Sequence, residues 1–144
     1  MAETLGSLCN KLTIVKLKQF HSDAADRLES LQQQETLLKV EIDQFFNDAL
    51  SGFIPIEKLN FSGNRINKEQ GNETRTINGN IGSVFAELAK INCDLWHEQE
   101  KVYDFETVYA SQKNEVVKKL AILNLESNKC MDAINEKFIE LCRG

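Results

Sequence analysis

The residues that interrupt α-helices are concentrated in one short part of this 144-residue chain. The only proline, Pro55, and five of the seven glycines lie between residues 52 and 82. Proline and glycine destabilise helix interiors, so the stretches on either side, roughly 4–50 and 80–142, are free to form long helices. The sequence therefore predicts two helical blocks separated by a loop at 51–79.

The two blocks repeat one another. Residues 4–21, TLGSLCNKLTIVKLKQFH, align with residues 80–97, NIGSVFAELAKINCDLWH, at an offset of 76. The identical pairs in this alignment are Gly6 and Gly82, Ser7 and Ser83, Leu12 and Leu88, and His21 and His97. At an offset of 92 the aligned apolar pairs are Leu28 and Leu120, Leu31 and Leu123, Ile42 and Ile134, and Phe46 and Phe138. The shared order and spacing indicate an internal duplication.

The two offsets, 76 and 92, differ by 16 residues, which predicts a longer second hairpin. If each block is a helix, a turn and a helix, about eight extra residues in each arm add about 12 Å. Apolar residues recur at coiled-coil spacing from Ile81 to Tyr109 and from Leu120 to Leu141, interrupted at positions such as Glu98 and Ser127. We predict a single all-α domain, a four-helix bundle made of two duplicated antiparallel hairpins at 4–50 and 80–142.

The connecting loop divides into two parts by composition. Residues 51–61, SGFIPIEKLNF, carry enough apolar side chains to lie against the bundle. The next stretch, residues 62–80, is polar and rich in asparagine and glycine, with little to bury. We expect this second part to be mobile.

Charge and composition argue against several classes of function. The net charge is −5, so the chain lacks the basic surface with which nucleic-acid-binding proteins contact phosphates. No apolar stretch is long enough to span a membrane. The start, MAETLGSLCNKL, lacks the basic and apolar regions of a secretory leader, and the four cysteines form no CxxC pair. We expect a cytoplasmic protein with reduced thiols and no cofactor.

One stretch, INCDLWHEQE at 91–100, brings a histidine close to the only tryptophan and to several carboxylates. The candidate metal ligands are Asp94, His97 and Glu100. Their three-residue spacing makes them neighbours on a helix, so they could ligate a divalent ion. The matching residues of the first block are Lys18, His21 and Ala24. Since the carboxylates are not duplicated, a surface or interface role is favoured over a metal site of the kind that helical bundles build from several helices.

The aromatic residue and the histidine of this stretch are repeated, because Phe20 and His21 align with Trp96 and His97. On the heptad of the second block His97 lies opposite the seam, whereas His21 shares a face with apolar residues and is expected in a buried seam or subunit contact. Trp96 and Tyr103 belong to a second apolar stripe, which predicts a contact between hairpins or between subunits. The candidate ligand-binding or interface residues are Phe20, His21, Trp96, His97 and Tyr103.

The first block, LGSLCNKLTIVKLKQFH, resembles the opening of bacterial families classed as domains of unknown function, in which an LGxLxDKLxIxxLKxWH-like start leads into a helical hairpin. INCDLWHEQE and AILNLESNKCMDAINEKF are similar to the LWxxED and LNxxRNxLIxxID segments of these families. The chain departs from the pattern at Asn10, where the families have an acidic residue, and near Ser127, where they have an arginine. The resemblance implies an all-helical, dimeric protein of unestablished activity, often encoded near glycosyltransferases of cell-surface polysaccharide assembly.

Motifs for catalysis are scarce. The sequence has no GxSxG, HExxH or Walker loop, and long amphipathic hairpins favour a non-enzymatic interaction or assembly protein, as a homodimer or with a helical partner. The resemblance adds an accessory role in polysaccharide biosynthesis. The alternative is a metal-dependent all-α nucleotide pyrophosphohydrolase, which holds magnesium with helical ExxE and ExxD pairs. No ExxE occurs here, and the nearest carboxylate pairs are Asp23 with Asp26 and Glu126 with Asp132.

Overall fold

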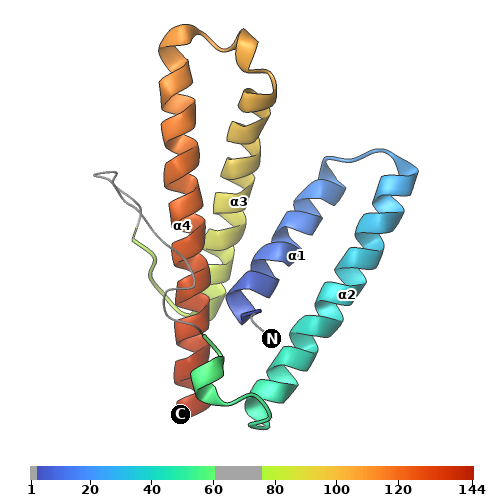
Figure 1. The fold of residues 1–144 in the computed structure, drawn as a ribbon, viewed down its shortest axis with the longest axis vertical. Helices are drawn as coiled ribbons and strands as arrows, with labels where there is room; N and C mark the ends of the chain where they lie inside the picture. Colours follow the sequence, from blue (N-terminus) through green and yellow to red (C-terminus); the bar gives the residue numbers. More distant parts are fainter. Residues whose placement is uncertain (1–2, 61–75) are drawn as a thin grey trace.

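The computed structural model describes residues 3–60 and 76–144, and within these ranges it is all helical, as predicted (Figure 1). The four α-helices are α1 (Leu5–Phe20), α2 (Ala25–Leu50), α3 (Ile81–Tyr103) and α4 (Ala110–Arg143). Two 3-10 turns, η1 (Ile56–Lys58) and η2 (Phe105–Thr107), lie in the connections. No helix in these ranges is long and apolar enough to cross a membrane.

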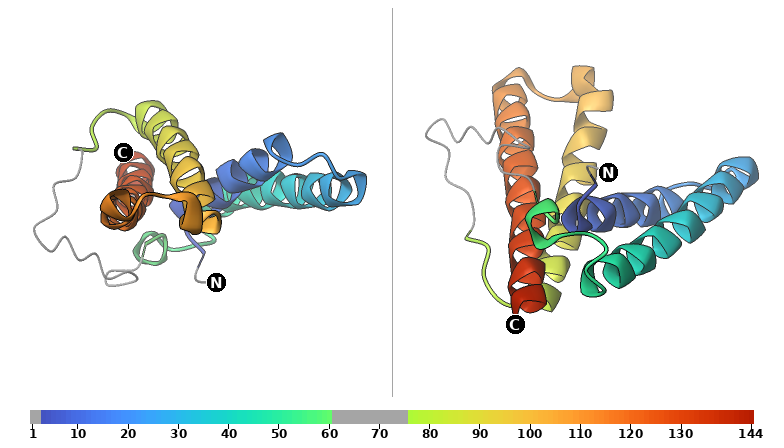
Figure 2. Two further views of the ribbon diagram at one scale, coloured as in Figure 1. Left: turned by 90° about the horizontal axis from the view of Figure 1, so that it is seen from above. Right: turned by 60° about the horizontal axis from the view of Figure 1, so that its bottom comes forward.

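The helices form two antiparallel hairpins that meet at one end and diverge at the other (Figure 1). α1 packs against α2 and also against α3 and α4, so it is the helix that joins the two hairpins. The first turns of α2 lie on the far side of α1 from the second hairpin, and the C-terminal end of α2 approaches α4 (Figures 1 and 2). The arrangement is therefore an open bundle rather than a closed square of four helices.

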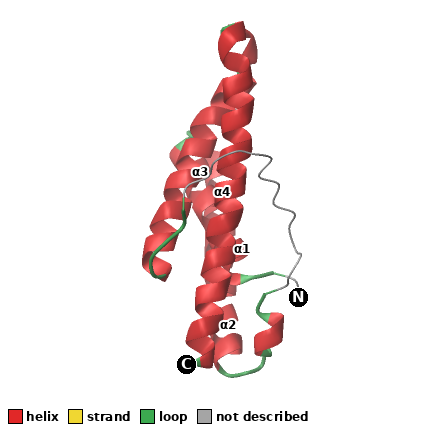
Figure 3. Cartoon of the chain, turned by 90° about the vertical axis from the view of Figure 1, so that its left-hand side faces the viewer, coloured by secondary structure: helices red, strands yellow, loops and turns green. Residues whose placement is uncertain are grey.

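The helix lengths agree with the predicted insertion in the second hairpin. α1 begins at Leu5 and α3 at Ile81, which are aligned positions of the duplication. α3 has 23 residues against 16 in α1, and α4 has 34 against 26 in α2. The second hairpin consequently rises above the first when the molecule is seen from the side (Figure 3). We call its projecting part, residues 97–117, the overhang.

The predicted seam is wrong at the tip of the second hairpin. Apolar spacing was expected to continue along the first arm through Phe105 to Tyr109, but α3 ends at Tyr103 and α4 begins at Ala110. Asp104 leaves the helix with φ −117° and ψ 41°, and a 3-10 turn follows. The connection contains apolar residues and no glycine or proline, so periodicity alone does not reveal it.

The buried core runs along the seam of the second hairpin and continues into the first. Along the seam of the second hairpin Val84, Leu88 and Ile91 of α3 and Cys130 and Ile134 of α4 are fully buried. Near the C-terminal ends of α2 and α4 three phenylalanine rings are in contact. The ring centroids of Phe45 and Phe46 lie 5.9 and 5.1 Å from that of Phe138.

The first part of the connecting loop lies against the bundle, as its composition predicted. Ile54 and Ile56 pack on the core, and Leu59, just after η1, is 2% exposed. Most of the stretch that was expected to be mobile, residues 62–80, lies outside the described residues.

The start of α1 is fastened to α4 by a buried polar contact that we call the joint. The amide of Gly6 donates to Asn135 Oδ1 at 2.7 Å, and Asn135 Nδ2 donates to Thr4 Oγ1 at 3.2 Å. Thr4 also caps α1, because its hydroxyl accepts from the amide of Ser7. A Cβ atom on Gly6 would overlap the backbone of Met131, so glycine is what lets the two helices approach this closely.

Glu98, the residue that interrupts the apolar seam of α3, is buried with two lysines around it. Its Oε1 lies 3.0 Å from Lys119 Nζ and 3.2 Å from Lys101 Nζ. Burial alone would raise the pKa of Glu98, but the hydrogen bonds and charges of Lys119 and Lys101 outweigh it and lower the pKa below its ordinary value. The carboxylate is thus stabilised in its charged form, linking α3 to α4 near the overhang.

The four cysteines form no disulfide with one another. Cys9 and Cys130 are buried, Cys142 is half-buried and Cys93 is exposed. Burial raises the pKa of the Cys9 thiol to about 12, so this side chain behaves as an apolar core residue.

The joint predicts opposite effects for two glycines that are equivalent in the duplication. Gly6→Ala should destabilise the fold by about 1–3 kcal/mol, because its methyl group has to push α1 away from α4. Gly82→Ala is the matched control: it meets open space and should be neutral or stabilising by up to about 1 kcal/mol. Urea unfolding followed by circular dichroism measures both, and equal effects would contradict the close contact at the joint.

The Glu98 contact predicts a pH-dependent contribution to stability. The pKa of Glu98 is lower in the folded than in the unfolded chain, so its stabilisation is present above the ordinary glutamate value of 4.5 and is lost as the pH falls below it. Glu98→Gln should therefore be less stable than the wild type at pH 7, and the difference should shrink in acid. Urea unfolding across this pH range measures it, with exposed Glu29→Gln as the control. A difference that is independent of pH would count against this interpretation.

Candidate functional site

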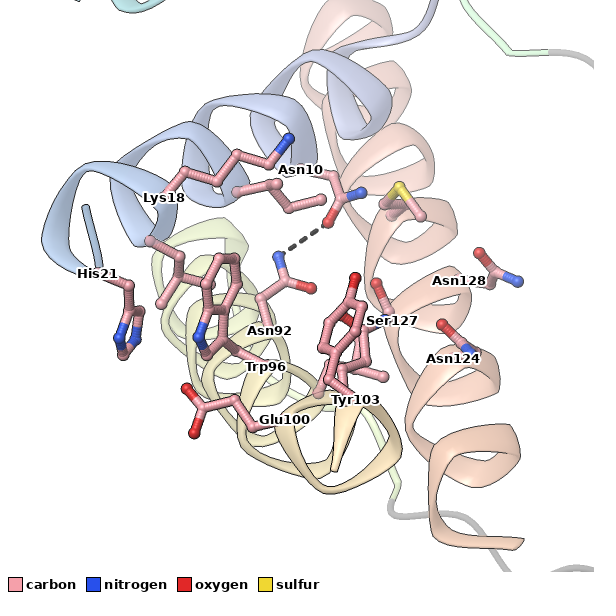
Figure 4. A pocket seen from close by; sticks show the side chains of 15 residues that line it. Asn10, Lys18, His21, Asn92, Trp96, Glu100, Tyr103, Asn124, Ser127 and Asn128 are labelled. Carbon is pink, nitrogen blue, oxygen red and sulfur yellow. Dashed lines mark hydrogen bonds between the residues drawn. The ribbon is translucent and has the colours of Figure 1, made fainter. Parts of the chain in front are cut away.

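A cleft lies where the two hairpins diverge. It has a volume of about 690 Å³, within the range of small-molecule sites, and opens to solvent along one side. One wall is α1, and the other is the α3–α4 face of the second hairpin (Figure 4). The residues that line it are Asn10, Ile14, Leu17, Lys18 and His21 of α1, Asn92, Leu95, Trp96, Gln99, Glu100 and Tyr103 of α3, and Asn124, Ser127, Asn128 and Met131 of α4.

Helical spacing explains why these side chains gather. From Asn10 to His21, each lining residue is one, three or four positions after the one before it. Residues three or four positions apart lie on the same side of a helix, so these side chains form one stripe along α1. The α3 stripe runs from Asn92 to Tyr103 in the same way, and a shorter one runs from Asn124 to Met131 on α4. Three stripes from three helices therefore converge on one space.

An amide network closes the deep end of the cleft. Asn92 is 4% exposed, and its Nδ2 donates to Asn10 Oδ1 at 2.9 Å and to Thr13 Oγ1 at 2.6 Å (Figure 4). The contact ties the middle of α1 to α3. A buried side-chain amide without hydrogen-bond partners destabilises the fold, so Asn92 has to stay within hydrogen-bond distance of Asn10 and Thr13. The network therefore fixes the distance between α1 and α3 at this point.

Above the network, Trp96 and His21 bridge the two hairpins. Their rings are stacked, with centroids 4.7 Å apart and an angle of 9° between the planes. Phe20 meets the edge of the same imidazole at 5.1 Å and is 84% exposed. Trp96 therefore contacts the first hairpin through His21.

One of the two environments predicted for His21, a buried seam, is wrong, because His21 is exposed and caps the C-terminal end of α1. The other, a subunit contact, stays a prediction. Because α1 ends at Phe20, its next residue no longer follows the helical face from which burial was inferred. His97, by contrast, lies within α3 and is exposed on the side away from the seam, as its heptad position indicated.

The three candidate metal ligands lie along α3 without forming a metal site. Within residues 3–60 and 76–144, no group of three or more His, Cys, Asp and Glu side chains is placed to hold a metal ion. Asp94 instead pairs with Lys90 at 3.5 Å, one turn earlier on the helix. Glu100 lines the cleft, whereas His97 does not. Tyr103 also lines the cleft, at its upper end, and is 91% exposed.

Several residues of the cleft were not among the candidates from sequence. Asn10 and Asn92 form the network, and Ser127 is 5% exposed on the cleft side of α4. A signal was available for Ser127, because it interrupts the apolar seam of α4. A polar residue at a position where the apolar pattern expects a core side chain indicates that no apolar side chain of a neighbouring helix packs against it there. Asn10 and Asn92 belong to different helices, and their pairing depends on how the hairpins meet.

The chemistry of the cleft favours binding. Leu17, Leu95 and Met131 give it an apolar floor, and amides and hydroxyls surround that floor with hydrogen-bond donors and acceptors. Charges are few: Lys18 lies on the α1 wall and Glu100 on the α3 wall. Such a surface can hold an amphipathic partner.

Comparisons of this chain with protein-family models, with curated proteins and with solved structures find no match.

The network predicts a specific loss of stability. Asn92→Leu removes two hydrogen bonds and leaves Asn10 and Thr13 without this partner, so it should destabilise the fold by about 1–2 kcal/mol. Asn124→Leu is the control: Asn124 lines the same cleft but is exposed, and its change should stay within about 0.5 kcal/mol. Thermal unfolding of both variants gives the comparison. If the two variants lost stability equally, the network would not be what holds α1 to α3.

Proposed function

We propose that this protein is a non-catalytic helical interaction module, which assembles with a second copy of itself through the face on which the cleft opens. The observation that carries the proposal is the continuity of the cleft with exposed apolar side chains of the overhang. Tyr103 lines the cleft and is 91% exposed. Val117 is 56% exposed and lies two helical turns before Asn124, so it is on the same side of α4.

Apolar side chains line the cleft and continue on the overhang above it. The floor residues Leu17, Leu95 and Met131 line a hollow that is open to solvent, and Tyr103 and Val117 extend the apolar surface upward. Monomeric proteins rarely expose apolar patches of large continuous area, and such patches mark association surfaces. Covering this one would remove apolar area from water, which is the main driving force for association.

A two-fold dimer fits the shape of the face. Two-fold contacts use the same patch on both copies, so the patch has to carry a projection as well as a hollow. Here the overhang is the projection, and its residues Gln99, Glu100 and Tyr103 form part of the cleft lining. In the proposed dimer each overhang lies in the cleft of the other copy, so that a helical hairpin packs against the helices α1, α3 and α4 where the bundle is open.

The polar residues of the cleft suit the rim of such a contact. Gln99, Asn124 and Asn128 can donate and accept hydrogen bonds without the cost of burying a charge. An amphipathic helix of another protein would use the same face. We propose the second copy as the occupant because the overhang supplies a complementary apolar projection within this chain.

A matched pair of valine substitutions tests the proposal. Val117→Lys places a charge on the proposed interface, whereas Val40→Lys places it on the exposed outer side of α2, where the valine is 60% exposed. Light scattering during size-exclusion chromatography should give the wild type and Val40→Lys a mass of twice 16.4 kDa, and Val117→Lys a mass near 16.4 kDa. Circular dichroism checks that both variants fold.

Two results would overturn this proposal. A wild-type mass of 16.4 kDa at every concentration tested would exclude self-association and leave a helix of another protein as the occupant of the face. A dimer that Val117→Lys does not weaken would place the subunit contact elsewhere on the molecule.

A further inference from the structure

The cleft that the proposed dimer covers carries two oppositely charged side chains that do not pair with each other. Lys18 lies on the α1 wall and Glu100 on the α3 wall, and among the described residues no other lysine, arginine, aspartate or glutamate lines the cleft. Figure 4 shows the Lys18 side chain extending toward Asn10 and the Glu100 carboxylate on the other side of Trp96. Each charge therefore belongs to the cleft without being neutralised by the other.

Neither charge has an opposite partner elsewhere in the described part of the chain. Lys16, two residues before Lys18, pairs with Glu35 at 2.8 Å, and Glu98 of α3 is held by two lysines. In contrast, the side chains of Lys18 and Glu100 make no ion pair with any described residue. A charge that is covered without a partner opposes association, so a dimer through this face needs an opposite charge for each of them.

The first helix and the overhang are opposite in charge. α1 contains three lysines and no acidic residue, whereas the overhang, residues 97–117, contains five acidic residues and two lysines. In the proposed dimer the overhang of one copy lies against α1 of the other, so the elements that meet attract each other. The two elements belong to the same face of the chain, as a two-fold contact requires. This complementarity favours a second copy as the occupant of the cleft.

The neighbours of the two charges indicate that the charges meet across the dimer. Glu100 and Tyr103 are three residues apart on α3, so their side chains are adjacent on one face of the overhang. Lys18 directly follows Leu17, an apolar residue of the cleft floor, and both line the cleft. When Tyr103 of one copy covers the partner's Leu17, Glu100 comes within about one helical turn of the partner's Lys18.

We infer, on the basis of the proposed dimer, that Lys18 of each copy forms an ion pair with the partner's Glu100. The two-fold axis generates this contact twice, so the dimer contains two equivalent pairs. The apolar surfaces drive the association, and the two pairs select the partner. A surface without an acid at this place would leave Lys18 covered and unpaired, which disfavours other helices in the cleft. The partner copy thereby completes a site that is incomplete in the single chain.

Exchange of the two charges tests this pairing. Lys18→Glu places two carboxylates together in each contact, and Glu100→Lys places two amines together. Each variant alone should therefore raise the Kd of the dimer by about tenfold or more. The double variant Lys18→Glu/Glu100→Lys brings opposite charges together again and should regain most of the lost affinity. Equilibrium sedimentation measures these constants, and circular dichroism checks that each variant folds, as expected for changes at exposed positions.

An equimolar mixture of the two single variants is a second test. In a mixed dimer the introduced carboxylate meets the introduced amine in one contact, and the native Lys18 meets the native Glu100 in the other. The mixture should therefore dimerise at a concentration where each variant alone is a monomer. Lys58→Glu and Glu29→Lys are the matched controls, because they reverse the charge of exposed residues outside the cleft lining and should associate like the wild type.

Three results would overturn the inference, and they separate it from the proposed dimer. If both single variants weaken the dimer but neither the double variant nor the mixture restores it, the two charges do not pair with each other. If the single variants associate like the two controls while Val117→Lys is a monomer, the proposed dimer stands without this ion pair. A wild type that is a monomer at every concentration tested overturns the dimer and the pairing together.

Discussion

The arrangement of this molecule depends on the contact between the first turn of α1 and the last third of α4. Gly6 lets the two backbones approach, and Asn135 satisfies both its amide and the hydroxyl of Thr4 in a place where water is excluded. These partners are 129 and 131 residues apart in the chain, so the contact joins one hairpin to the other. Further along α1, the Asn92 network and the stacking of Trp96 on His21 also join it to the second hairpin.

The size of the groups between the helices changes along α1, and this explains why the hairpins diverge. At the joint there is no side chain on Gly6, in the middle there is a pair of amides, and at the end an indole ring lies against an imidazole. The spacing of α1 from the second hairpin therefore grows from its start to its end. The cleft lies on the widening side, and it owes its polar deep end and its aromatic upper end to the same groups.

Sequence reasoning succeeded where a pattern is local. Helix breakers placed the two blocks, and the duplication led to hairpins of unequal length, which α3 and α4 show. It failed at the tip of the second hairpin. The apolar spacing of α3 continues to Tyr109, but α3 ends at Tyr103 and Tyr109 lies in the connection just before α4. His21 is a similar case, because its expected burial assumed one more turn of α1. In both places the helix ends without glycine or proline, so no residue marks the turn.

The sequence by itself determined the secondary structure, the pairing of helices within each hairpin and the greater length of the second, because apolar periodicity and the repeat act over short distances. Only the tertiary structure decided that α1 packs against both α3 and α4 and that His21 meets Trp96. These contacts join different helices, and their geometry follows from how closely Gly6 lets α1 approach α4. A periodic pattern specifies which face of a helix is apolar, but the angle between two hairpins depends on the volume of the particular groups packed between them.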